Sequence, residues 1–166
     1  MTDHSAPSDI VKKGHGTPLA SAEELHAYIP YLLLRIANRW NVTQNRVLAD
    51  YGTNNIVLRT LSILHIFRTL TVNEIAVLVV TEQSSTSRMI DTMVAAGLVE
   101  RHISEADLRR RDIAITEKGE ELLKESWPLM SAHYDRLIKG VSVEDLAVTT
   151  RVLGQMVENV REHAIG

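Results

Sequence analysis

The sequence contains no cysteine, and this absence excludes several kinds of chemistry. A chain without thiols cannot form disulfides, use a thiolate nucleophile or sense oxidants through cysteine. The absence fits a cytoplasmic protein, because disulfides are rare in that compartment, and we expect this location. Aromatic residues are also scarce, at 4 % of 166 residues, so the core must be built mainly from Leu, Ile, Val, Met and Ala.

Long hydrophobic runs are absent as well. The run "IAVLVV", from Ile75 to Val80, is far shorter than the roughly 20 residues that a membrane-spanning helix needs. The first residues include no apolar stretch of the kind found in secretory signals. Proline and glycine instead punctuate a polar segment at residues 1–20, which predicts a flexible N-terminal tail. We therefore expect no membrane partner.

The patterns of common catalytic and metal sites are also missing. The chain has no Gly-rich phosphate loop, no G-x-S-x-G nucleophile motif and no H-E-x-x-H zinc motif. None of its seven histidines lies four residues from another. The nearest approach to a metal pair, Glu23 with His26, is typical of a solvated helix surface. The sequence therefore predicts that the protein is not an enzyme and holds no metal or cofactor.

The patterns "SAEE" from Ser21 and "TVNE" from Thr71 are capping boxes that predict helix starts, and "SVED" from Ser142 is a further predicted start. Together with apolar periodicity they predict a mainly α-helical chain with one β-hairpin. Pro30 should kink or restart the first helix, and Gly97 is a suitable residue to end the fourth. After Gly97 the apolar period changes from helical to alternating, which indicates two short strands. The expected helices cover residues 21–49, 56–67, 71–79, 82–97, 117–139 and 142–163, and the expected strands cover residues 98–103 and 112–116.

Two short helices followed by a hairpin form the order of a winged helix-turn-helix, in which the second short helix enters the DNA major groove. The helix expected at residues 82–97 has one apolar face, and its opposite face carries Arg88, which can reach a guanine or a phosphate. Taken alone, the opposite face also fits an ordinary solvated surface rich in serine and threonine. The apolar face consists of Met89, Ile90, Met93 and Val94, and the opposite face consists of Ser84, Ser85, Arg88, Asp91, Thr92 and Ala95.

The charge distribution indicates local rather than general attraction to DNA. The net charge is −3, and residues 81–119 contain six basic and seven acidic residues. Arg109, Arg110 and Arg111 are nevertheless consecutive between the two expected strands. Arginines at a hairpin tip can enter the narrow minor groove, where the potential is most negative. The same residues are also compatible with a solvated turn that protects a sheet edge from aggregation.

Residues 82–119 resemble the MarR family of bacterial transcription regulators. They are similar to the family's recognition helix, its "GLVER" strand, its wing signature Asp-x-Arg, and the "TEKG" that opens the next helix. The resemblance implies that Arg109 enters the minor groove and that Asp107 holds this arginine in place. Arg110 and Arg111 extend the wing. The family's serine or threonine cluster and its arginine correspond to Ser84, Ser85, Ser87 and Arg88, and Thr92 on the same helix is a further candidate DNA contact.

The resemblance extends over about residues 21–163 and implies a homodimer held by the N- and C-terminal helices. The expected organisation is the tail at residues 1–20 and a single domain at 21–166. Within it, the winged helix-turn-helix covers about 54–118 and the dimerisation helices about 21–50 and 117–163. The terminal helices have wide apolar stripes that a monomer would struggle to cover. These stripes consist of Leu25, Ile29, Leu32, Leu33 and Ile36, and of Leu146, Val152, Leu153, Met156, Val157 and Val160.

In the family, a small molecule bound near the junction of the dimer helices and the winged motif weakens DNA binding. Arg35 and Arg39 lie one helical turn apart and suit an anionic effector such as an aromatic carboxylate. His65, in the apolar second helix, is a third candidate, with a satisfied core histidine as the alternative interpretation. The two arginines could equally contact DNA phosphates or pair with acids of the C-terminal helices.

These observations predict a ligand-responsive transcriptional regulator that binds double-stranded DNA. The expected form is a repressor that a small molecule releases from a pseudo-palindromic operator. The competing hypothesis is a helical dimeric interaction module whose winged motif is degenerate and binds no DNA. The absence of net positive charge in residues 81–119 favours this second hypothesis.

Overall fold

The computed structural model describes residues 18–103 and 111–160, which belong to two compact units. The first unit ends at Leu123 and the second begins at Lys124. No helix within the two described ranges is long and apolar enough to cross a membrane.

The first unit begins with two consecutive helices, α2 (Ala22–Ala27) and α3 (Ile29–Leu48). Ser21 caps α2 by accepting a hydrogen bond from the Glu24 amide at 3.1 Å, as the capping pattern predicts. Pro30 lies in the first turn of α3, where its missing N–H costs no helical hydrogen bond. Of the two predicted outcomes at this proline, the structure shows the restart.

A short 3-10 turn, η1 (Ala49–Tyr51), connects α3 to α4 (Asn55–Phe67). Gly52 follows the turn with φ 64°, a left-handed conformation that glycine adopts without steric cost. Asn54 then caps α4, because its side chain accepts a hydrogen bond from the amide three residues further on at 3.0 Å.

Two short helices follow, α5 (Val72–Val79) and α6 (Gln83–Ala95). Thr71 and Glu74 form the predicted capping box of α5, in which each side chain accepts a hydrogen bond from the backbone amide of the other residue. Beyond α6, Gly97 has φ 72°, which confirms the predicted glycine stop.

Three strands form one antiparallel sheet in the order β1-β3-β2. The hairpin strands β2 (Val99–Ile103) and β3 (Arg111–Ile115) agree with the predicted strands within one residue at each end. The outer strand β1 (Thr69–Thr71) was not predicted. Three residues are too few to show strand alternation, and the last of them also caps α5.

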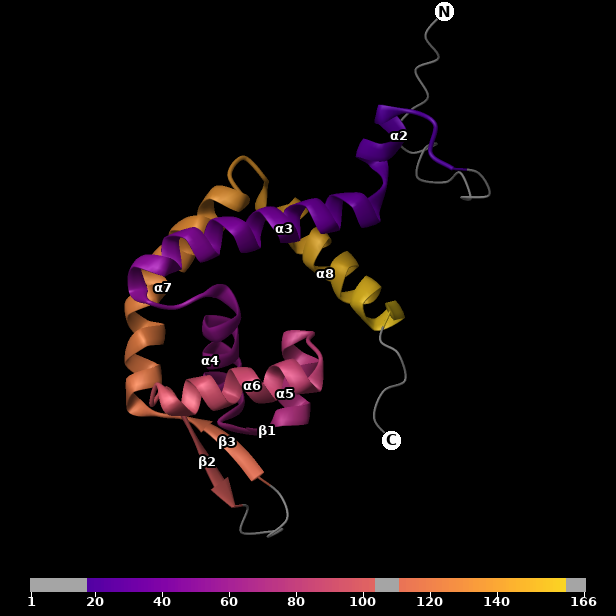
Figure 1. Cartoon of the computed structure of the whole chain (residues 1–166). Helices are drawn as coiled ribbons and strands as arrows, with labels where there is room; N and C mark the ends of the chain where they lie inside the picture. Colours follow the sequence, from indigo (N-terminus) through magenta and orange to yellow (C-terminus); the bar gives the residue numbers. More distant parts are fainter. Residues whose placement is uncertain (1–17, 104–110, 161–166) are drawn as a thin grey trace, which may run out of the picture. The chain divides into compact units, whose positions relative to one another are not determined.

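The core of the first unit lies between α4, α5, α6 and the sheet, and the hairpin projects away from these helices (Figure 1). This core is aliphatic, as the scarcity of aromatic residues predicts. Its fully buried members include Leu61, Leu64, Ile75, Ile90 and Ile113, each with no exposed surface.

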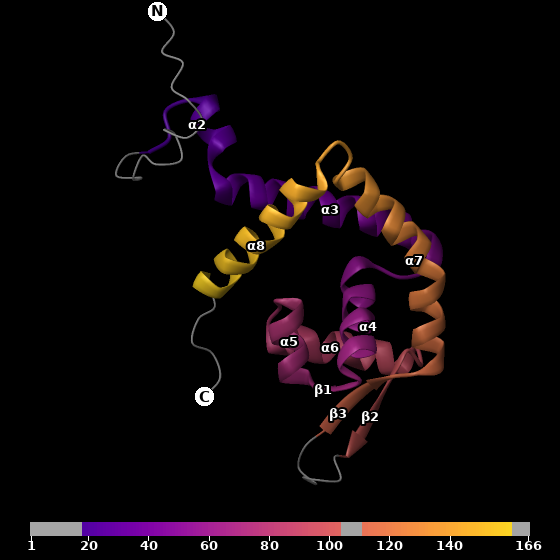
Figure 2. The ribbon, with the colours of Figure 1, turned by 180° about the vertical axis from the view of Figure 1, so that it is seen from behind.

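Helix α7 (Glu117–Leu137) begins in the first unit and continues into the second, where α8 (Val143–Val160) follows it. Both helices are visible from behind in Figure 2. Ser142 caps α8 by accepting a hydrogen bond from the Asp145 amide at 3.0 Å. No residue of α8 is buried, and its Val157 and Val160 side chains are 54 % and 76 % exposed. Helix α8 therefore presents an uncovered apolar surface.

Candidate nucleic-acid interface

The second short helix, α6, is divided into a buried and an exposed face. Thr86, Ile90 and Met93 are at most 1 % exposed and fix the helix against the core. Ser87 lies at the margin and is half-buried. The predicted outward face is exposed throughout, and it consists of Ser84, Ser85, Arg88, Asp91, Thr92 and Ala95.

Two side-chain hydrogen bonds involve the exposed face of α6. The Thr92 hydroxyl donates to the carbonyl oxygen of Arg88 at 3.0 Å. Arg88 Nη2 donates to Ser85 Oγ at 3.4 Å. Because a guanidinium has several N–H donors, this single long bond leaves Arg88 able to bind a base edge or a phosphate.

A salt bridge ties α6 to the hairpin. Arg101 of β2 places Nη2 at 2.6 Å from Asp91 Oδ1 on the exposed face of α6. Both side chains remain partly exposed, so the pair contributes little to stability. The salt bridge has a larger effect on the surface charge, because Arg101 neutralises Asp91, the one carboxylate on the exposed face of α6.

The "TEKG" segment, residues 116–119, connects the base of the hairpin to the end of α6 through hydrogen bonds. The Thr116 hydroxyl donates to the Gly97 carbonyl at 2.7 Å and also accepts from the Gly119 amide at 3.2 Å. Lys118 Nζ donates to the Ala96 carbonyl at 2.7 Å. Gly119 packs so closely that a Cβ there would collide with the Leu98 carbonyl oxygen. The segment thus fixes the angle between α6 and the hairpin.

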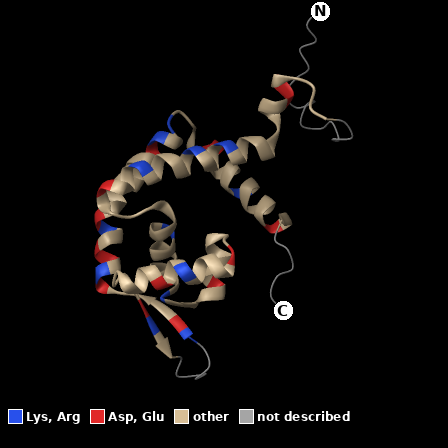
Figure 3. Cartoon of the chain, in the orientation of Figure 1, with Lys and Arg blue, Asp and Glu red and all other residues tan. Residues whose placement is uncertain are grey.

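Charges of both signs alternate over this surface, as Figure 3 shows along α6, the hairpin and the start of α7. Arg88 and Asp91 lie on α6, while Glu100 and Arg101 are neighbours on β2. Basic and acidic residues are therefore interspersed along the described parts of α6, β2 and the start of α7. Any attraction to DNA depends on individual arginines and on the wing.

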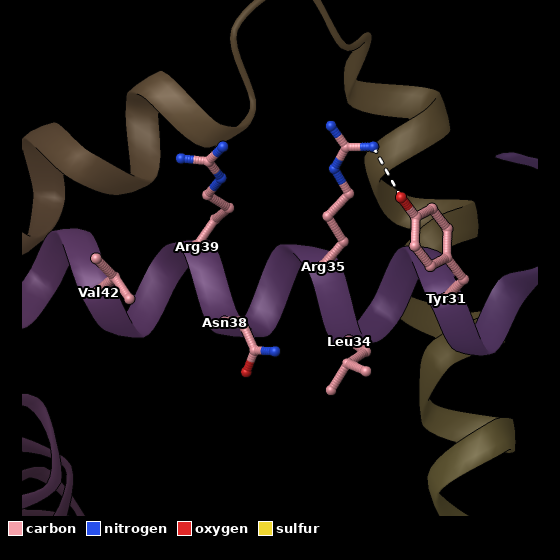
Figure 4. A pocket seen from close by; sticks show the side chains of 6 residues that line it. All are labelled: Tyr31, Leu34, Arg35, Asn38, Arg39 and Val42. Carbon is pink, nitrogen blue, oxygen red and sulfur yellow. Dashed lines mark hydrogen bonds between the residues drawn. The ribbon is translucent and has the colours of Figure 1, made fainter.

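A hollow of about 420 Å³ lies along α3. The side chains of Arg35 and Arg39 point to the same side of the helix, one turn apart (Figure 4). Arg35 Nη1 donates to the Tyr31 hydroxyl at 3.1 Å, and its guanidinium carbon lies 5.9 Å from the centre of the same ring. The other lining residues are Leu34, Asn38 and Val42. An anion and an apolar ring would both find suitable partners there.

Comparisons with known proteins agree with this geometry. Residues 51–110 match the sequence model of the MarR family. A MarR family transcriptional regulator from Silicibacter pomeroyi DSS is 36 % identical, covering 87 % of this chain and 97 % of its own, with a TM-score of 0.81. The chain belongs to the MarR family. A second MarR family regulator from Silicibacter pomeroyi is 30 % identical over 89 % of this chain and 100 % of its own, with a TM-score of 0.78. The S. aureus MepR–DNA complex shares the fold at 20 % identity, over 82 % of this chain and 99 % of its own, with a TM-score of 0.73.

The wing of this MarR chain is described only at its base. Asp107, Arg109 and Arg110 lie outside the described residues, and their roles stay predictions. Arg111 is the first residue of β3, opposite Ile103 of β2, and its side chain is exposed.

The alternative interpretation of His65, as a satisfied core histidine, is wrong. The side chain is 50 % exposed, and its Nδ1 lies 2.6 Å from Glu120 Oε2 at the start of α7. Arg68 Nη1 lies 3.9 Å from the other oxygen of the same carboxylate. The last turn of α4 is exposed here, so a position within an apolar helix does not place this residue in the core. His65 also does not line the hollow beside Arg35 and Arg39.

No group of three His, Asp or Glu side chains in residues 18–103 and 111–160 could hold a metal ion. The contact between Arg101 and Asp91 was not predicted from the sequence, because the two residues are ten positions apart and lie on different elements, a strand and a helix. The family-like "GLVER" segment marked the strand that carries Arg101, but not the residue that it pairs with.

Proposed function

We propose that this MarR family member is a transcriptional regulator that binds double-stranded DNA. The observation that carries the proposal is the exposed face of α6, where Arg88 and small hydroxylated residues stand beside a hairpin fixed by Arg101. Small side chains let a helix approach base edges closely, and an arginine can read guanine or hold a phosphate. The DNA-binding part of this proposal is the winged helix-turn-helix at about residues 54–118.

The contacts divide between the two grooves. Helix α6 enters the major groove, with Arg88 reaching furthest. The wing follows the backbone to the adjacent minor groove, where Arg109 enters and Asp107 restrains it. Arg110 and Arg111 add positive charge beside the phosphates. The residues assigned to the major groove are Ser84, Ser85, Ser87, Arg88 and Thr92. That S. aureus MepR forms a complex with DNA supports this use of the fold.

The protein acts as a homodimer in this proposal. Helix α8 has no buried residue, although most helical stability in proteins comes from packing of an apolar face. Helix α3 likewise leaves Leu34 and Ile36 61 % and 50 % exposed. A second copy of the chain that covers these surfaces would stabilise both helices. Two-fold symmetry then requires a pseudo-palindromic operator.

A small anionic molecule, such as an aromatic carboxylate, is the proposed effector. Arg35 and Arg39 supply two guanidinium groups at the hollow on α3, and Tyr31 and Val42 supply apolar surface. Binding there would favour one dimer shape and lower the affinity for DNA. Release of DNA by an effector is the behaviour of a repressor.

A dimeric interaction module that binds no DNA is the second candidate. The balanced charges of α6 and the hairpin favour it. The deciding experiment measures binding of the full-length protein to a fluorescent random-sequence duplex over a range of salt concentrations. A regulator binds with an affinity that falls steeply as salt rises, because bound counterions are released. Dimerisation without salt-dependent binding would support the interaction module instead.

A further inference from the structure

The turn between α5 and α6 holds an unusual backbone conformation. Val80 has φ 56° and ψ 59°, a left-handed region that a β-branched residue rarely adopts. The Val80 amide donates to the Val77 carbonyl, and the Thr81 amide donates to the Ala76 carbonyl at 3.0 Å. This is the helix ending in which glycine normally takes the left-handed position. A valine persists there only where the surrounding structure holds the turn in place.

Arg59 holds this turn from α4. Its Nη1 donates to the carbonyl oxygen of Val79, the last residue of α5, at 3.3 Å. The final carbonyls of a helix lack partners within the helix and carry partial negative charge. The guanidinium therefore satisfies the carbonyl that immediately precedes the left-handed residue.

Asn41 connects the guanidinium of Arg59 to α3, the long N-terminal helix on which Asn41 lies. Its Oδ1 accepts from Asn55 Nδ2 at 2.6 Å and, more distantly, from Arg59 Nη2 at 3.5 Å. Asn45, one turn further along α3, accepts from the Asn55 amide at 2.8 Å. Asn55 is 7 % exposed, so its two bonds to α3 are partly shielded from water, whereas the contact between Arg59 and Asn41 is exposed. The start of α4 is thus joined to α3 through Asn55, and the Arg59 side chain reaches the same Asn41 oxygen.

We propose that Arg59 is a positioning residue for the recognition helix and that Asn41 couples it to α3. Arg59 sets the turn from which α6 departs, so α3 governs the angle at which α6 is presented. Asn41 lies within one helical turn of Asn38 and Val42, which line the hollow. A displacement of α3 by a bound molecule would be passed to the α5–α6 turn through these side chains. The inference rests on the proposed DNA-binding function and adds the residues that regulate it.

The test is a double-mutant cycle in the full-length protein. Asn41→Ala, Arg59→Met and the double variant are titrated with a duplex selected from a random pool for wild-type binding. We expect each single variant to bind about tenfold more weakly. The double variant should bind no more weakly than Arg59→Met, because both changes break one connection. Arg46→Met, which removes an exposed arginine elsewhere on α3, is the matched control and should retain a larger share of the affinity.

Three readouts separate positioning from a direct phosphate contact or a folding defect. The salt slope of Arg59→Met should match that of the wild type, whereas loss of a phosphate contact lowers the slope by about one. Arg59→Lys should bind as weakly as Arg59→Met, because one ammonium cannot replace the two-pronged guanidinium. Thermal unfolding must show both variants folded at the assay temperature.

Additive losses in the cycle, a reduced salt slope or full rescue by lysine would each overturn the positioning role. Loss of binding that is explained by unfolding of the variants would overturn it too. Failure of the wild type to bind any duplex in a salt-dependent manner would instead refute the proposed function itself.

Discussion

Arg101 on strand β2 lies 2.6 Å from Asp91 on helix α6, and this contact joins the two elements that the proposed interface requires. Asp91 faces the same way as Arg88, so an unpaired carboxylate there would repel DNA phosphates. The arginine both cancels this charge and restrains the hairpin. Arg101 can thereby affect the DNA affinity of the exposed face of α6 without contacting DNA itself.

Replacing Arg101 should weaken DNA binding while leaving the free energy of unfolding almost unchanged. In Arg101→Met, the free energy of unfolding should change by less than about 1 kcal/mol, because the pair is at the surface. The affinity for DNA should fall about tenfold, because Asp91 is no longer neutralised. Adding Asp91→Asn should restore most of that loss. Equal affinities of Arg101→Met and the double variant would rule out the neutralising role.

The wing prediction concerns Arg109 and Asp107. Arg109→Ala should weaken binding to most sequences and lower the salt slope by about one, because a minor-groove cation is lost. Asp107→Ala should reproduce part of this loss, since an unrestrained arginine loses more conformational entropy on binding. Arg88→Ala is the contrast, because it should also weaken binding and can alter base preference. An unchanged affinity and slope in Arg109→Ala would show that the wing is misassigned.

Gly119 should be indispensable for the junction between the hairpin and α7. A Cβ at this position would press on the Leu98 carbonyl oxygen and lie 2.8 Å from Ile115 Cγ1. Gly119→Ala should therefore lower the free energy of unfolding by about 2 kcal/mol, measured by urea denaturation. Gly154→Ala on α8 is the control, because its added methyl group meets nothing within 4 Å. A stability of Gly119→Ala equal to that of the control would contradict the close packing.

The apolar stripe of α8 should hold the dimer together. Val157→Lys places a charge on this stripe and should give a monomer at micromolar concentration, as measured by sedimentation equilibrium. Gln155→Lys, on a different face of the same helix, should leave the dimer intact. Deletion of residues 143–166 should abolish dimerisation as well. A compact wild-type monomer under these conditions would exclude the two-fold arrangement.

The effector prediction uses benzoate and naphthoate as probes of the hollow on α3. An effective carboxylate should release DNA from the wild type. Arg35→Ala and Arg39→Ala should each need about tenfold more of it, because a charged hydrogen bond is lost. Arg46→Ala is the control on the same helix. If both variants release DNA at the wild-type concentration, the two arginines do not anchor the anion and belong to a structural or DNA-facing set.

The sequence predicted those elements whose signals are local. Three helices are capped at the residues that the capping patterns predict, which are Ser21, Thr71 and Ser142. Gly97 follows the end of α6 with the positive φ that a glycine stop requires. Strand β1 escaped because three residues show no period. The division of α6 into buried and exposed faces was also predictable, since helical periodicity alone determines which residues share a side.

Contacts between elements were not predictable in the same way. Arg59 reaches the Val79 carbonyl across 20 positions, and His65 reaches Glu120 across 55. Such pairs depend on how α4 packs against α5 and α7, which no local pattern encodes. His65 shows the consequence, because an apolar helix suggested burial while its last turn leaves the ring at the surface.

The most direct test of the central claim is a hydroxyl-radical footprint of the full-length protein on a duplex selected from a random pool. A symmetric dimer that inserts two α6 helices into successive major grooves should protect two segments on one side of the DNA. Their centres should lie about one helical turn, ~34 Å, apart. Absence of protection at concentrations where the protein is dimeric would contradict the account, as would a single protected segment without a symmetric partner.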